Sequence, residues 1–148
     1  MELVSKFAES LKDLMYDHQL TTEKLSTDTT ISDSSINTWL TGNANYLPSV
    51  PYVILLADYF KCSVEYLIGL EEKNYLPNPK PCPPFSNRFR IAVTSKGFSL
   101  YKLSKRINMG TGNFYRWISG EREPSLDSLV RIAKVLDCSI DYLLGRGD

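Results

Sequence analysis

CSVEYLIG occupies residues 62–69 and CSIDYLLG occupies residues 138–145. The two octamers share five identical residues and differ elsewhere only by chemically similar ones. The likeness extends upstream, since WLTGNANYLPSVPYVILLADYFK (39–61) aligns with WISGEREPSLDSLVRIAKVLD (117–137) once two extra residues are allowed in the first stretch. Still further upstream, four apolar residues match at a constant offset of 78: Phe7, Leu11, Leu25 and Ile36 match Phe85, Phe89, Leu103 and Phe114. Such a fixed-offset resemblance over about 60 residues predicts two copies of one structural unit.

Each copy has the apolar spacing of helices. Phe7, Leu11 and Leu14 recur at i, i+4 and i+7, the stripe of an amphipathic helix, and Phe85, Phe89 and Ala92 repeat that spacing. Residues that favour helix N-caps precede most of the predicted helices: Thr21, Ser32, Ser49, Ser63, Ser99, Ser125 and Ser139, with Gly110 in the equivalent place of the second copy. No stretch alternates with period two over a useful length. We therefore expect an all-α protein made of two tandem five-helix units.

A proline-rich segment separates the copies. EEKNYLPNPKPCPP spans residues 71–84 and holds five of the eight prolines in the chain. Proline favours the extended polyproline II conformation, in which 14 residues at ~3.1 Å each reach about 43 Å. We therefore expect a first domain at 1–70, a semi-rigid linker at 71–84 and a second domain at 85–148. The alternative is that the segment folds back onto a domain through Tyr75, Leu76 and Phe85.

Charge divides the chain in the same way. Residues 1–76 hold five basic and 11 acidic residues, a formal charge of −6, whereas residues 77–148 hold 12 basic and six acidic ones, a charge of +6. This asymmetry indicates that only the second half approaches a polyanion.

Enzyme chemistry has little support in the sequence. His18, the single histidine, is predicted to be a solvated residue near the end of the first helix, and no glycine-rich phosphate loop or metal-spaced cluster occurs. The chain has three cysteines and no CxxC motif. We expect Cys62, Cys82 and Cys138 to pack as small apolar side chains. We expect no enzymatic activity, cofactor, metal or small-molecule ligand. The longest apolar run, residues 52–57, is too short to cross a membrane, and we expect a cytoplasmic protein.

The second half resembles the lambda-repressor-like (Cro/Xre-type) helix-turn-helix family. The resemblance covers most of residues 85–146 and rests on FSNRFRIA (85–92), KGFSLYKLS (96–104), WISGEREPS (117–125) and IAKVLDCSIDYLLG (132–145). The first half resembles the same family more weakly, over residues 3–70. The resemblance therefore implies two tandem helix-turn-helix domains.

In this family the third helix of the domain enters the major groove of DNA while the second crosses the phosphate backbone. Carried over to this chain, the recognition helix is GTGNFYRWI, residues 110–118. The implied base-contacting residues are Thr111, Asn113 and Arg116. The implied backbone-contacting residues are Lys96, Lys102, Tyr115 and Arg122. Gly112, on the same outward face, offers no side chain for readout.

The first copy fits DNA less well. Its equivalent helix is SDSSINTWL, residues 32–40, whose outward positions include Asp33, Ser34 and Thr38 and no cation. A carboxylate there would repel phosphates, so these three residues are predicted to contact protein. The candidate contacts are the chain's own second half, a second copy in a homodimer, or an effector.

The combined prediction is a sequence-specific DNA-binding transcriptional regulator, acting as a repressor, with double-stranded DNA as its partner. The alternative is a protein-interaction module, such as an antitoxin or an anti-repressor partner, whose acidic first copy engages a basic protein and whose contact with DNA is secondary.

Overall fold

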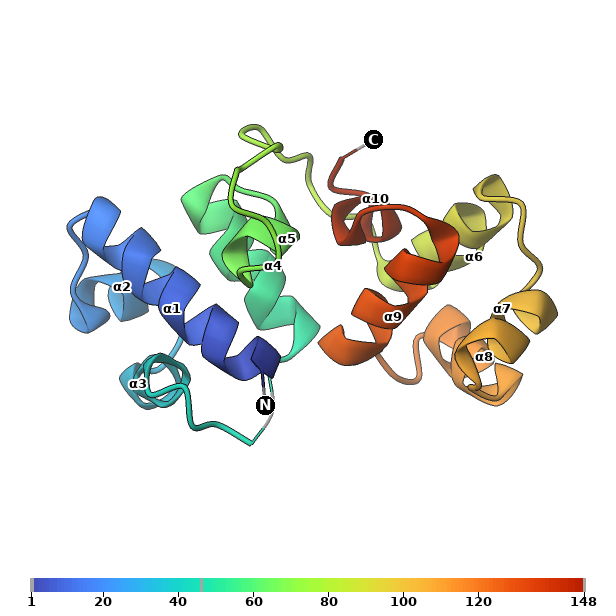
Figure 1. Ribbon diagram of the computed structural model, residues 1–148, viewed down its shortest axis with the longest axis horizontal. Coiled ribbons are helices and arrows are strands. Elements are labelled where there is room, and N and C mark those ends of the chain that lie inside the picture. The colour runs from blue at the N-terminus through green and yellow to red at the C-terminus, as the bar shows by residue number, and fades with distance from the viewer. Residues whose placement is uncertain (1, 46, 148) are drawn as a thin grey trace. The chain divides into compact units, whose positions relative to one another are not determined.

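The structure, a computed structural model, describes residues 2–45 and 47–147 of the chain. Within these residues the regular elements are ten α-helices, and no strand occurs (Figure 1). The expectation of an all-α protein is therefore confirmed. The helices fall into two compact units, Met1–Pro79 and Lys80–Asp148, which are described separately below. No helix among the described residues combines the length and the apolar character needed to cross a membrane.

The first unit contains five helices: α1 (Glu2–Asp17), α2 (Thr22–Thr29), α3 (Asp33–Leu40), α4 (Val50–Phe60) and α5 (Val64–Leu67). Helix α1 packs against α3 and α5, α2 against α3 and α4, and α4 against α5. The predicted stripe on α1 is buried, with Phe7 and Leu11 almost fully inaccessible. Ile36 from α3, Val53 and Leu56 from α4, and Leu67 from α5 complete a single apolar core.

The second unit also contains five helices: α6 (Phe85–Ser95), α7 (Leu100–Ile107), α8 (Thr111–Ser119), α9 (Leu126–Leu136) and α10 (Ile140–Leu144). Helix α6 packs against α7, α8 and α10, while α9 packs against α7 and α10. Aromatic rings join α6 to α8, because the Phe89 ring centroid lies 5.3 Å from those of both Phe114 and Trp117. These buried aromatic contacts fix which side of α8 faces the core.

Side-chain caps start most of the helices, as the sequence predicts. The hydroxyl oxygens of six residues accept a backbone N–H in the first turn: Thr21, Ser32, Ser63, Ser99, Ser125 and Ser139. Such a cap stabilises a helix by about 1 kcal/mol. Ser49 is the N-cap of α4, as predicted, but its side chain makes no such bond. Pro51 lies in the first turn of α4, where its missing N–H does no harm.

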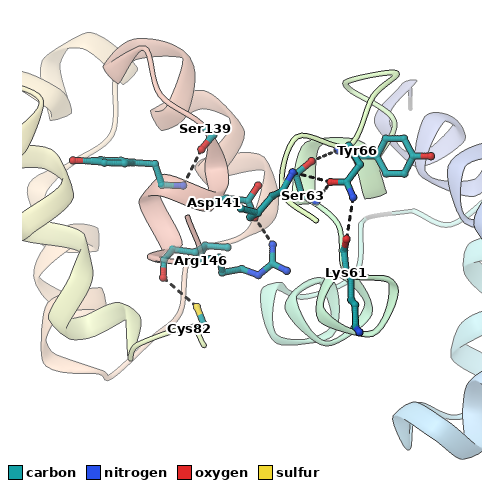
Figure 2. A network of polar contacts seen from close by, with 11 residues as sticks. Lys61, Ser63, Tyr66, Cys82, Ser139, Asp141 and Arg146 are labelled. Atoms are coloured by element: carbon teal, nitrogen blue, oxygen red, sulfur yellow. Dashed lines mark hydrogen bonds and ion pairs between the residues drawn. The ribbon is translucent and has the colours of Figure 1, made fainter. Parts of the chain in front are cut away.

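The proline-rich segment makes contacts at both of its ends (Figure 2). In the first unit, the Asn74 side chain accepts hydrogen bonds from the backbone N–H of Ser63 and of Leu76, and it donates to the carbonyl oxygen of Lys61. Tyr75 is 72% exposed and is therefore no anchor. In the second unit, the Lys80 N–H donates to the Arg146 carbonyl, and the Cys82 thiol donates to the Leu144 carbonyl.

The C-terminal end of the second unit also contains an ion pair. Arg146 binds the carboxylate of Asp141, which lies in α10 (Figure 2). Pro83 approaches Gly145 so closely that a Cβ added to this glycine would lie 2.8 Å from the proline ring. Residues 80–83 are thus packed on the C-terminal end of their unit.

Candidate nucleic-acid interface

A three-residue turn, residues 108–110, joins helices α7 and α8. Asn108 ends α7 in the left-handed region, with φ of 54°, and its N–H donates to the Ser104 carbonyl. The Arg131 guanidinium, from α9, donates to the carbonyl of Ile107 at the last turn of α7. Leu103 of α7 and Phe114 of α8 are fully buried, so both helices turn their polar sides to solvent. Both helices therefore expose polar and charged side chains, together with Tyr101 and Tyr115.

The polar side of α8 carries the predicted base-contacting residues. Because an α-helix has 3.6 residues per turn, burial of Phe114 and Trp117 directs Gly112 outward, with Tyr115 and Arg116 on either side of it. Thr111 and Asn113 lie on the two flanks, nearer the buried face. Asn113 and Arg116 are exposed, and Thr111 is half-buried. The Asn113 amide nitrogen lies 3.3 Å from the Gly110 carbonyl oxygen, to which it donates. Two of the three predicted residues are thus exposed to solvent.

Arg116 has an acidic neighbour. Its Nε lies 3.9 Å from Oε2 of Glu121, and both side chains are more than half exposed. The backbone N–H of Arg122 donates to the Arg116 carbonyl at 3.2 Å, so the loop after α8 folds back under the guanidinium. Arg122 itself is exposed. The loop thus brings a second cation, Arg122, and a carboxylate, Glu121, to the C-terminal end of α8.

The exposed side of α7 is a row of cations held over aromatic rings. The Lys102 ammonium lies 4.8 Å from the Phe98 ring centroid, and the Arg106 guanidinium carbon lies 5.9 Å from the same centroid. The Lys105 ammonium lies 5.2 Å from the Tyr101 ring. The sequence analysis selected Lys102 but missed Lys105 and Arg106, although their spacing of three and four residues from Lys102 predicts a shared helix face.

Lys96 is placed elsewhere. Its ammonium lies 4.5 Å from the ring centroid of Tyr142 in α10, and the Arg88 guanidinium lies 4.7 Å from the same ring. Arg88 also donates two hydrogen bonds to the Tyr142 carbonyl. The structure thus sets Lys96 against α10 and does not bring it together with the cations of α7.

In the first unit, α2 and α3 occupy the same chain positions with different chemistry. Asp33, Ser34 and Thr38 are exposed on α3, which carries no cation. Ser34 and Thr38 line an open cavity of about 560 Å³, with most of its other lining side chains being neutral and polar. The structure therefore exposes the three predicted protein-contacting residues.

The end of α2 carries a hydrogen-bonded carboxylate. The Tyr59 hydroxyl donates to Asp28 Oδ2 at 2.6 Å, and the Lys24 ammonium lies 3.1 Å from Oδ1. The hydrogen bond from Tyr59, followed by that from Lys24, lowers the pKa of Asp28, and the same bond raises the pKa of Tyr59. The position 78 residues later holds Arg106, so the two units present opposite charges at this point.

Two other features of the described residues are their possible metal ligands and the surroundings of the single histidine. Among residues 2–45 and 47–147, no three histidine, cysteine or acidic side chains gather in a way that could hold a metal ion. His18 lies just beyond α1 and is exposed, with Nδ1 2.9 Å from the Leu14 carbonyl oxygen.

Comparison with known proteins gives one family and one relative. A helix-turn-helix family model matches residues 89–143, from the middle of α6 to α10. The chain is similar to the HTH-type transcriptional regulator ImmR of Bacillus subtilis (strain 168), with 26% identity over 61 residues, which are 41% of this chain and 48% of the relative. The chain thus matches about half the length of that relative. No solved structure matches it. Residues 89–143 of this chain therefore form a helix-turn-helix domain.

Proposed function

We propose that this chain is a sequence-specific DNA-binding transcriptional regulator that places α8 of its second unit in the major groove of double-stranded DNA. The observation that carries the proposal is the shared surface of α7 and α8, where exposed Arg116 and Asn113 stand beside a row of exposed cations. Its support from outside the chain is the helix-turn-helix match and the similarity to a transcriptional regulator. Acting as a repressor, a protein seated in this way would block access of polymerase to a promoter.

Each side chain has a role in this proposal. Arg116 makes a bidentate contact to O6 and N7 of guanine, which contributes ~1–3 kcal/mol of discrimination, while Asn113 pairs with adenine and Thr111 contacts a neighbouring base. Lys102, Tyr115 and Arg122 contact phosphates, joined by Lys105 and Arg106 on the exposed side of α7. Lys96 contributes as a more distant cation, since its ammonium lies over Tyr142.

The first unit has a different role in this proposal. It is a second, tandem copy of the domain, joined by the proline-rich segment, that has lost the charges needed for DNA. Asp33, Ser34 and Thr38 contact protein, either in a homodimer or against the second unit of the same chain. The exposed Asp33 and the absence of cations on α3 favour this role, because phosphates repel a carboxylate placed at the groove.

A titration of duplex DNA tests the proposal. Fluorescence anisotropy of labelled duplexes is measured between about 50 and 300 mM salt, and log K is expected to fall linearly with log salt at ~0.9 per phosphate neutralised. Arg116→Ala is expected to weaken binding to a duplex selected from a random pool and to relax the preference at one base pair. Lys134→Ala, which removes one exposed cation from α9, is the matched control and should leave the preference intact.

Two results would contradict the proposal. A complete lack of salt-dependent binding to any duplex removes DNA binding as the function. If Asp33→Ala changes the base preference as much as Arg116→Ala does, both units read DNA and the role given to the first unit is wrong.

A further inference from the structure

An aromatic side chain on the outward side of α8 holds a cation from another helix. Tyr115 is 53% exposed, and the guanidinium carbon of Arg90, on α6, lies 5.9 Å from its ring centroid. This is within the distance at which a cation is attracted to the face of an aromatic ring. Arg90 lies outside the two helices of the candidate interface, so no part of the proposed function yet uses it.

The Arg90 side chain does not take part in the buried core of the second unit. The buried face of α6 consists of Phe89, Ala92 and Val93, whereas Arg90 is exposed. Among the described residues, Arg90 has no carboxylate within ion-pair distance. The position 78 residues earlier holds Lys12, whose ammonium lies 3.9 Å from the Glu9 carboxylate. Lys12 of the first unit is thus paired with a carboxylate, whereas Arg90 of the second unit contacts the Tyr115 ring.

The position of Tyr115 on α8 directs Arg90 to the edge of the proposed DNA contact. A helix of about 10–12 Å diameter fills a major groove of about 12 Å width, so residues on its flanks lie close to the phosphates that border the groove. Tyr115 lies at one edge of the outward side of α8, across Gly112 from Arg116 and next to Arg90 of α6. A guanidinium stacked on the ring is restrained while its N–H groups stay available at the edge, in the planar arrangement that suits a phosphate.

We propose that Arg90 is a further phosphate-contacting residue and that Tyr115 positions it, so that the DNA-binding surface includes α6 as well as α7 and α8. This inference rests on the proposed function, because it assigns two more roles to the same surface. It also gives Tyr115 a role through its ring rather than through its hydroxyl.

Salt-dependent anisotropy with the full chain and one labelled duplex tests the inference. Arg90→Ala is expected to reduce the slope of log K against log salt by ~0.9, which is about an eight-fold loss of affinity at 0.1 M salt. Arg90→Lys retains the charge and should keep the slope near that of the unchanged chain. Lys134→Ala is the matched control, since it removes one exposed cation from the same unit away from Tyr115, and it should leave the slope unchanged.

The role of the ring is tested separately. Tyr115→Phe keeps the aromatic face, so Arg90→Ala should lower the slope in a Tyr115→Phe background by as much as it does in the unchanged chain. In a Tyr115→Ala background Arg90→Ala should lower the slope by clearly less, because both changes remove the same contact. Thermal unfolding of each variant shows that the second unit remains folded.

The outcomes separate this inference from the function on which it rests. If the unchanged chain binds DNA and Arg90→Ala has the same slope as the unchanged chain, or as Lys134→Ala, Arg90 makes no specific phosphate contact and the inference alone is overturned. If Arg90→Ala lowers the slope by the same amount in the Tyr115→Phe and Tyr115→Ala backgrounds, the positioning role is overturned. If the unchanged chain binds no duplex, the proposed function and the inference both fail.

Discussion

The guanidinium of Arg116 lies 3.9 Å from the carboxylate of Glu121, and both side chains remain largely in solvent. The residue proposed to read a base is therefore held, in the free protein, by a carboxylate from the loop that follows its own helix. An exposed ion pair of this kind contributes roughly 0–1 kcal/mol, which a phosphate or a guanine can easily replace. Glu121 also adds a negative charge at the edge of the proposed DNA contact.

Glu121→Gln should therefore strengthen DNA binding. The substitution frees the Arg116 side chain and removes a charge that phosphates repel, so we expect affinity to rise roughly two- to five-fold at 0.1 M salt. Anisotropy titrations of the selected duplex measure the change. Glu123→Gln removes the same charge from the same loop, without an ion pair to Arg116, and should have a smaller effect. A loss of affinity in Glu121→Gln would instead mean that the carboxylate positions Arg116 for DNA.

The hydrogen bond between Tyr59 and Asp28 makes a pH-dependent prediction for the first unit. The pKa of Asp28 is lowered in the folded protein, chiefly by this bond and then by Lys24. The resulting stabilisation is fully present above the ordinary aspartate pKa of about 3.9, and it is lost as pH falls through the lower folded value. The pKa of Tyr59 is raised by the same bond, so at the alkaline end the stabilisation is lost as pH rises through that raised value.

Tyr59→Phe should return the pKa of Asp28 toward its ordinary value, because it removes the largest single interaction that lowers it. Carbon NMR of the Asp28 carboxylate, followed between about pH 2 and 6, measures this shift. Tyr52→Phe alters another tyrosine of α4 and should leave the titration unchanged. An unaltered Asp28 titration in Tyr59→Phe would show that the bond is absent in solution.

Asn74 is expected to stabilise the first unit although it lies in the proline-rich segment. Its amide makes three hydrogen bonds, to the Ser63 and Leu76 N–H groups and to the Lys61 carbonyl. Asn74→Ala leaves these backbone groups without a partner and should lower the free energy of unfolding by about 1–3 kcal/mol. The neighbouring change Lys73→Ala, at an exposed position, should have little effect.

Each unit contains a single tryptophan, which allows the two unfolding transitions to be followed separately. In a Trp117→Phe background the fluorescence of Trp39 reports the first unit alone. Asn74→Ala should shift this transition and leave the transition of the second unit, followed in a Trp39→Phe background, in place. An unchanged first transition would place the end of the folded unit before residue 74, as the sequence analysis proposed with its boundary at residue 70.

The sequence predicts well those features that depend on residues close together in the chain. The buried stripe of Phe7 and Leu11 follows from helical spacing, and the caps at Ser32 and Ser125 follow from the preference of hydroxyl side chains for helix starts. Ser49 also begins its helix, although its side chain makes no cap bond. Local rules thus fix the helices and their inward faces.

The sequence does not predict which side chains from different helices meet. Lys96 lies over Tyr142, Arg90 over Tyr115, and Asn74 under the start of α5, each across many residues of chain. These pairings depend on how helices pack, and no periodicity in the sequence encodes them. For the same reason the sequence does not indicate that Lys96 meets α10 or that Arg90 meets α8.

Gly112 and Gly120, at opposite ends of α8, should respond to alanine with opposite signs. A Cβ at Gly112 would meet open space, and its φ is not in the left-handed region, so Gly112→Ala should stabilise the second unit by about 0.5–1 kcal/mol. Gly120 has φ of +81°, so Gly120→Ala should destabilise the unit by about 1–2 kcal/mol. Thermal unfolding followed by Trp117 in the Trp39→Phe background measures both changes, at roughly 4–8 °C per kcal/mol.

DNA binding by Gly112→Ala then tells how closely α8 approaches the groove. Gly112 lies on the outward side of α8 with Arg116, so an added methyl group stands between the helix backbone and the base edges. We expect affinity for the selected duplex to fall although stability rises, a combination that unfolding of the variant cannot explain. A rise in both quantities would show that α8 meets DNA through long side chains such as Arg116, with its backbone held away from the bases at Gly112.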